Sequence, residues 1–189
     1  MNPLIDCARD GALVVSRPDW ASLVVTGPDR KSWLNGLVTC DLAKLSPGTV
    51  AVGLALNKNG KVLTDVIIVE QADRLIVAVL ASKVDALCET FEGFLIMEDA
   101  ELSIAKEPWL WSMAIGPVSD EVARRAATRD GVSSAPAVIS DLAGAILLDQ
   151  RRDAASLAFD WQEELENPIA RSVGLETWNA LRFDLGMPR

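Results

Sequence analysis

The chain of 189 residues contains no histidine, no tyrosine and only three cysteines. The absence of histidine removes the commonest metal ligand and the usual general base near neutral pH, so we expect no metal site. Cys7, Cys40 and Cys88 are too few and too widely spaced for a disulfide framework. Any proton transfer must therefore use carboxylates, lysines, cysteines or the substrate itself.

Long apolar runs and clusters of basic residues are also missing. The longest apolar runs, such as 66–69 and 75–80, are far shorter than the roughly 20 residues that a membrane-spanning helix needs. Asp6, Arg9 and Asp10 interrupt the only early apolar stretch, which argues against a signal peptide. The net charge of −9 argues against a nucleic-acid surface. We expect a cytoplasmic protein that contacts neither membranes nor nucleic acid.

Half of the residues are apolar, so a chain of this length can bury a substantial core. Apolar residues recur at strand spacing over 22–26 and 74–80 and at helix spacing over 83–94, and a further strand is predicted over 156–161. This pattern predicts an α+β fold in which helices cover one side of antiparallel sheets. We expect two α/β subdomains, over residues 1–101 and 102–189.

The most informative segment is 51–70, with the sequence AVGLALNKNGKVLTDVIIVE. Asn59-Gly60 is typical of a two-residue type I′ hairpin turn. The register that follows pairs Leu54 with Asp65 and Leu56 with Leu63. Because the side chains on both sides of the hairpin are mostly aliphatic, we expect both faces to be buried.

Asp65 is the one carboxylate inside this aliphatic hairpin. A buried charge costs several kcal/mol without a partner, so Asp65 should pair with a ligand, a cation or a hydrogen-bond donor. Ala51, Gly53 and Ala55 form a strip of small residues on one face, which would let another backbone, a helix or a flat ligand approach closely. We expect this strip to favour a homodimer.

The final helix is predicted from Leu175 to about residue 185. Its apolar stripe contains Trp178 and Leu181, and Arg182 falls on the same stripe. Asp184 should lie at the C-terminal end, where a carboxylate opposes the helix dipole. Asp184 is therefore either an ordinary surface residue or a residue kept for function.

Three segments in this order, VVTGPDRKSWLNGLVTCDL at 24–42, LALNKNGKVLTDVIIV at 54–69 and NALRFDLGMPR at 179–189, resemble the folate-binding superfamily of the glycine-cleavage T-protein (aminomethyltransferase) and the YgfZ-type proteins. The resemblance implies paired ferredoxin-like α/β units that form a pocket for tetrahydrofolate or a derivative. Both relatives continue beyond the third segment, so the likeness covers only their N-terminal folate-binding portion.

The resemblance also implies roles for particular residues. Asp65 aligns with the strand aspartate that is catalytic in T-proteins, and Thr64 with a position that often holds a second aspartate. Arg182 and Asp184 match the family's R-x-E-x-G motif, with aspartate in place of the pteridine-binding glutamate. Asn57, next to the turn, is either a turn residue or a further ligand contact.

Three functions remain open at this point. The first is a folate-binding carrier, sensor or accessory factor in one-carbon metabolism or in the maintenance of iron–sulfur enzymes. The second is an aminomethyl or one-carbon transferase that uses Asp65 and is completed by a partner chain. The third is a protein-interaction module that has lost the folate.

Overall fold

The computed structural model describes residues 2–106, 109–139, 142–150 and 170–186. It divides the chain into two compact units: unit 2 comprises Asp19–Pro108, and unit 1 comprises Met1–Pro18 together with Trp109–Arg189. The strand expected over 156–161 lies outside the described ranges. Among the described helices, none is long and apolar enough to cross a membrane.

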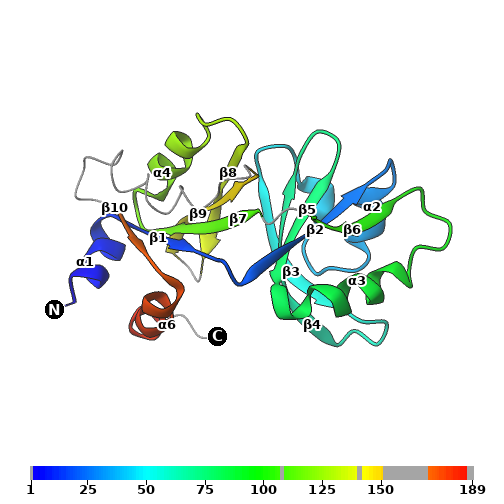
Figure 1. Cartoon of the computed structure of the whole chain (residues 1–189), viewed down its shortest axis with the longest axis horizontal. Coiled ribbons are helices and arrows are strands. Elements are labelled where there is room, and N and C mark those ends of the chain that lie inside the picture. The colour runs from blue at the N-terminus through cyan, green and yellow to red at the C-terminus, as the bar shows by residue number, and fades with distance from the viewer. Residues whose placement is uncertain (1, 107–108, 140–141, 151–169, 187–189) are drawn as a thin grey trace. The chain divides into compact units, whose positions relative to one another are not determined.

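The division differs from the boundary after residue 101 that we expected from the sequence. The first 18 residues belong with the C-terminal part of the chain, because their strand β1 (Ala12–Ser16) pairs with β7 (Leu110–Ile115) and with β10 (Ala170–Val173). Figure 1 shows blue β1 beside orange β10. Such long-range pairing leaves no signal in the local sequence.

Unit 2 is built on a five-stranded sheet in the order β3-β4-β5-β2-β6. The strands are β2 (Trp20–Thr26), β3 (Val50–Leu56), β4 (Val62–Glu70), β5 (Leu75–Leu80) and β6 (Glu101–Ile104). All neighbouring strands are antiparallel. The hairpin β3-β4 therefore lies at one edge of this sheet.

One face of the unit 2 sheet is covered by α2 (Arg30–Asn35) and α3 (Val84–Glu92), with short 3-10 helices η1 (Leu42–Lys44) and η2 (Ala81–Lys83) beside them. Their apolar side chains form the core with those of the strands. Trp33 and Phe91 meet edge to face, with ring centroids 6.1 Å apart. The core residues that are fully buried in this unit include Leu23, Leu34, Leu42, Ile68, Leu75, Val77 and Phe91.

Unit 1 contains a second five-stranded sheet in the order β10-β1-β7-β9-β8, where β8 is Val132–Ile139 and β9 is Leu142–Asp149. Only the β1-β10 pair is parallel. The described helices of this unit are α1 (Pro3–Asp10), α4 (Ser119–Ala126) and α6 (Leu175–Asp184). The mixed α+β class with largely antiparallel sheets confirms the fold class expected from the sequence.

The two units repeat one arrangement of strands. The order β4-β5-β2-β6 in unit 2 corresponds to β8-β9-β7-β1 in unit 1, with antiparallel neighbours in both. β2 and β7 are each followed by Gly-Pro and a helix, at Gly27-Pro28 and Gly116-Pro117. Units 1 and 2 thus share a supersecondary motif, although no repeat is visible in their sequences.

Candidate functional site

The turn of the β3-β4 hairpin has three residues instead of the two predicted. Asn57 N donates to Lys61 O at 2.9 Å, and Gly60 N donates to Asn57 O at 2.9 Å. Gly60 has φ +72°, which glycine adopts without a Cβ penalty. This is the pattern of a turn followed by a left-handed glycine, so the expected two-residue type I′ turn at Asn59-Gly60 is wrong.

A bulge farther along the hairpin restores the predicted register. Leu56 pairs with Val62, but Ala55 pairs with Thr64 and Leu54 pairs with Asp65, so Leu63 is the extra residue. The pairing of Leu54 with Asp65 is confirmed, whereas that of Leu56 with Leu63 is wrong. Leu63 packs against the core, and Val62 lies on the opposite face.

Asp65 lies on an exposed apolar face of this hairpin. Val52, Leu54 and Val62 are 53%, 38% and 57% exposed, and Asp65 is also exposed. Strand alternation and the pairing register place these residues, with half-buried Leu56, on one face, which we call the hairpin patch. The expectation that both faces are buried is wrong near the turn, because the helices cover only the other face.

The strip of small residues on β3 contacts the protein's own chain. A Cβ on Gly53 would lie 2.8 Å from Cys40 Sγ and 3.0 Å from Cys40 N. Thr39 N donates to Leu54 O, and the Thr39 hydroxyl accepts from Leu54 N at 2.9 Å. The segment after α2 therefore occupies the strip in which we expected a ligand or a second copy.

Asn57 and Thr64 support the hairpin. The side-chain oxygen of Asn57 accepts from Asn59 N at 2.9 Å and from Lys61 N at 3.0 Å, which closes the turn. Thr64 is buried, and its hydroxyl donates to Asp65 Oδ1 at 3.4 Å. These contacts fix the turn beside the patch and orient the Asp65 carboxylate.

Arg182 and Asp184 lie on α6 in unit 1. Arg182 is only 7% exposed, and its Nε is buried without a hydrogen-bond partner. Its guanidinium carbon lies 4.7 Å from the ring centroid of Phe183, and no ion pair to another described residue accompanies this contact. Asp184 is exposed and is the last residue of the helix, as the sequence predicts.

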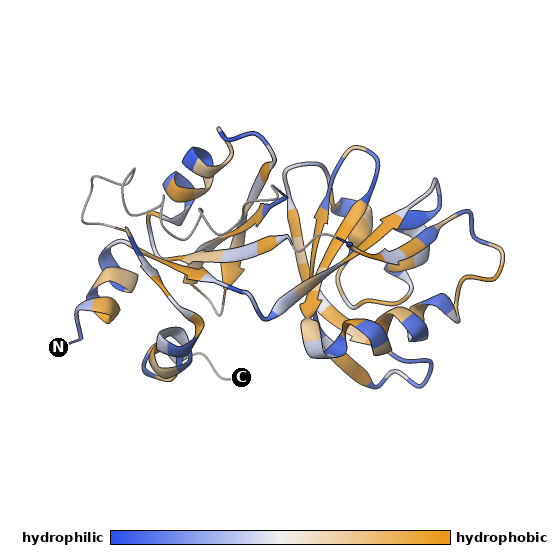
Figure 2. Cartoon of the chain, in the orientation of Figure 1, coloured by the Kyte–Doolittle hydropathy of each residue, from blue (hydrophilic) through white to orange (hydrophobic). Residues whose placement is uncertain are grey.

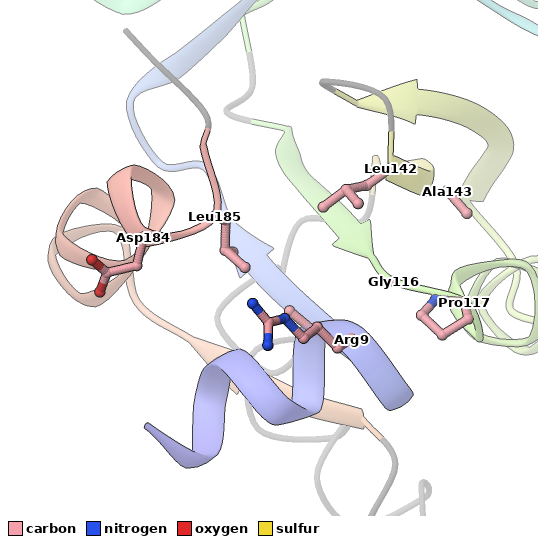
Figure 3. Close-up of a pocket in the computed structure, with 8 residues that line it drawn as sticks. Arg9, Gly116, Pro117, Leu142, Ala143, Asp184 and Leu185 are labelled. Atoms are coloured by element: carbon pink, nitrogen blue, oxygen red, sulfur yellow. The ribbon is translucent and has the colours of Figure 1, made fainter. Parts of the chain in front are cut away.

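Asp184 also borders a pocket within unit 1 that sequence reasoning missed. The pocket has a volume of about 400 Å³ and is lined by Ala8, Arg9, Gly116, Pro117, Leu142, Ala143, Asp184 and Leu185. In Figure 3, Arg9 extends from α1 toward Leu185, whereas the Asp184 carboxylate points away from the other lining residues. The Gly-Pro that follows β7 was the sequence signal that could have marked this place.

The cysteines and carboxylates give little sign of further chemistry. Cys7, Cys40 and Cys88 are free thiols, and burial raises the pKa of each of them, so all three are protonated near neutral pH. No group of three or more potential ligands in the described parts of the chain could hold a metal ion. Among the residues singled out from the sequence, Asp65 is an exposed carboxylate, and Arg182 is a buried cation whose Nε has no hydrogen-bond partner.

The chain matches a known protein family. The model of the GCVT N-terminal domain matches residues 8–138. The chain belongs to the GCVT N-terminal domain family. This match confirms the superfamily that the three sequence segments resemble. Comparison with curated protein sequences gave no match.

A solved structure has the same fold as this GCVT N-terminal domain protein. The glycine cleavage system aminomethyltransferase T from Bartonella henselae matches with a TM-score of 0.75 and 18% identity, over 97% of this chain and 53% of that one. The chain thus spans about half the length of that enzyme. A heterotetrameric sarcosine oxidase from Corynebacterium sp. U-96 matches with a TM-score of 0.48 and 13% identity, over 86% of this chain and 89% of that one.

Proposed function

We propose that this protein binds tetrahydrofolate or one of its derivatives, with Asp65 as the main polar contact. The observation that carries the proposal is the hairpin patch, in which an exposed carboxylate stands among exposed apolar side chains. Exposed apolar patches on proteins commonly mark sites of interaction. The family match and the resemblance to the aminomethyltransferase T fold support folate as the ligand.

The chemistry of the patch suits a pteridine ring. A pteridine is flat, with an apolar face and an edge of N–H donors, and such ligands fit apolar surfaces that carry a few placed polar groups. The Asp65 carboxylate can accept two N–H bonds from the aminopyrimidine edge. Val52 and Leu54, on the same face, can contact the face of the ring.

Arg182, in unit 1, is a separate position that suits an anion. Arg182 is 7% exposed as a residue and its buried Nε has no hydrogen-bond partner, which is costly unless an anion pairs with the guanidinium. Folate carries carboxylates on its glutamate tail, and arginine binds carboxylates through two parallel hydrogen bonds. Arg182 is therefore a position within unit 1 at which a carboxylate could bind, and Asp184, one methylene shorter than the family's glutamate, stays an expectation from the resemblance; the proposed site itself is the hairpin patch of unit 2.

In this proposal, Asn57 and Thr64 support the hairpin and do not contact the ligand directly. Asn57 fixes the turn, and Thr64 donates to the carboxylate that would bind the ligand. Both were sequence candidates for direct contact. Since the side-chain oxygen of Asn57 and the hydroxyl of Thr64 already have partners in the hairpin, we assign both residues to the positioning of Asp65.

Binding without turnover is the primary proposal, in a carrier or accessory role in one-carbon metabolism. The second candidate is aminomethyl transfer with Asp65 as the catalytic carboxylate, which the fold of the Bartonella enzyme favours. Because the chain spans about half of that enzyme, this activity calls for a partner chain that supplies the rest. We place the protein in the cytoplasm, where thiols such as its three free cysteines stay reduced.

Calorimetric titration with 5-formyltetrahydrofolate tests the proposal. A hydrogen bond to a charged group contributes about 1.5–3 kcal/mol, so Asp65→Asn should weaken binding roughly 10- to 100-fold. Asp85→Asn removes an exposed carboxylate on α3, which covers the opposite face of the sheet, and should leave the affinity unchanged. Absence of binding at millimolar ligand would refute the proposal and favour an interaction module.

The transferase candidate needs a separate assay. Turnover of methylene-tetrahydrofolate, alone or with a lipoyl-bearing protein, is expected only if a partner completes the chain. Folate binding without turnover under both conditions supports the carrier. Turnover that is abolished by Asp65→Asn supports the transferase.

A further inference from the structure

The loop between α3 and β6, residues 93–100, exposes two large apolar side chains next to each other. Ile96 is 83% exposed and Met97 is 91% exposed. Figure 2 shows this loop as a hydrophobic stretch followed by hydrophilic residues. Neighbouring apolar side chains that are this exposed are typical of a contact with another molecule. We call residues 93–100 the apolar loop.

Hydrogen bonds hold the apolar loop in one conformation. Glu98 Oε2 accepts from Ile96 N and from Met97 N, both at 3.1 Å. At the base of the loop, Asp29 N donates to Asp99 O at 3.1 Å, and Asp99 N donates to Asp29 Oδ2 at 2.9 Å. The two apolar side chains are therefore presented on a fixed turn, which lowers the entropy cost of binding.

Acidic residues flank the apolar loop, whereas basic residues lie at the turn end of the hairpin patch. Glu92, Glu98, Asp99 and Glu101 are exposed along or beside the loop. Lys58 and Lys61 are exposed at the hairpin turn, next to Val62, and neither forms an ion pair with a residue that the structure describes. Both surfaces belong to unit 2.

We propose that the apolar loop of one copy of this protein docks on the hairpin patch of a second copy. Ile96 and Met97 contact Val62 and Leu54, while Asp99 faces Lys61 across the contact. Complementary charge steers such an encounter and fixes its orientation. The proposal replaces the small-residue strip of β3 as the basis for a homodimer, because that strip is occupied by the chain itself.

A two-fold axis makes the contact reciprocal. In a dimer with this symmetry, each copy offers its loop and receives its partner's loop, so both contacts form twice over. The doubling explains how two modest surfaces could give a specific interface, which needs on the order of 1,000 Å² in total. The inference goes beyond the proposed function and requires no folate; because both occupants contact Leu54, the second copy and the ligand compete for the hairpin patch.

Sedimentation equilibrium of the ligand-free protein, with charge-reversed variants, tests the contact. The wild-type chain should dimerise at concentrations up to roughly 100 µM, a modest affinity for a small interface. Lys61→Glu and Asp99→Lys each place like charges opposite one another at both contacts, so each variant alone should dimerise at least tenfold more weakly. Their mixture restores opposite charges at both contacts and should dimerise like the wild type.

A control variant shows whether the charge reversals act through the two proposed surfaces. Lys83→Glu, at an exposed lysine outside both surfaces, is the matched control and should leave the dimer intact. Circular dichroism of each variant confirms that it is folded. A monomeric wild type, charge-reversed variants that still dimerise, or a mixture that stays monomeric would each overturn the proposal. Because no ligand is added, failure to bind folate leaves the result unaffected.

Discussion

Phe91 offers a direct test of how unit 2 is held together. Its side chain is 0% exposed in the core between α3 and the sheet, and its ring meets Trp33 edge to face at 82°. Replacing a buried phenylalanine by alanine removes its transfer free energy and leaves a cavity, which together cost about 3–5 kcal/mol. The lost aromatic pair accounts for about 0.5–1.5 kcal/mol beyond the buried area. We therefore expect Phe91→Ala to lower the free energy of unfolding by about 4 kcal/mol.

Phe183→Ala is the matched control, because it makes the same chemical change at a side chain that is 63% exposed. Its ring contacts the Arg182 guanidinium, and an exposed cation–π contact is worth about 1 kcal/mol at most. Urea denaturation followed by circular dichroism measures both variants. A loss below about 1 kcal/mol for Phe91→Ala would show that the core described for unit 2 is wrong.

Three further predictions concern the hairpin and the apolar loop. Gly53→Ala places a methyl group against Cys40 and should cost about 1–3 kcal/mol in a urea titration, and Cys40→Gly in the same chain should recover part of that loss. Asn57→Ala removes the one side-chain oxygen that accepts two hydrogen bonds in the turn and should destabilise the protein by about 1 kcal/mol on thermal unfolding, whereas an unchanged stability would contradict its role in the turn. Hydrogen bonds from the backbone N–H groups of Met97 and Ile96 lower the pKa of Glu98. The ionised carboxylate therefore stabilises the loop at any pH above the ordinary glutamate pKa of about 4.3. This stabilisation is lost as the pH falls through the lower pKa of the folded state. The amide NMR signals of Ile96 and Met97 should shift in this acidic range in the wild type, and their failure to shift would show that Glu98 does not hold the loop.

The sequence predicts the local features of the fold well. The hairpin, the helix expected over 83–94 and the end of α6 at Asp184 follow from turn residues, apolar spacing and stop signals, which act over a few residues. The family resemblance also emerges from sequence, because the motifs at 24–42 and 54–69 lie within the matched residues 8–138, whereas the motif at 179–189 lies beyond them.

Features that depend on long-range contacts escaped prediction. The bulge at Leu63 places Val62 on the patch, yet neither residue type signals a bulge. Docking of Cys40 on Gly53 joins segments that local patterns cannot connect. β1 belongs to unit 1 because of its pairing with β7 and β10, which are about 100 or more residues away in the sequence. The exposure of Asp65 depends on which face of the sheet the helices cover, and alternation alone does not decide this.

The central claim is that the hairpin patch with Asp65 binds a reduced folate. Methyl NMR of the protein during titration with 5-formyltetrahydrofolate tests it most directly, because Val52, Leu54 and Val62 are exposed on the patch while Val138 is exposed on β8 of unit 1. The account predicts saturable shifts at the three patch methyl signals, little change at Val138, and loss of the shifts in Asp65→Asn. Saturable binding that leaves the three patch signals unmoved, or no binding at all, would contradict it.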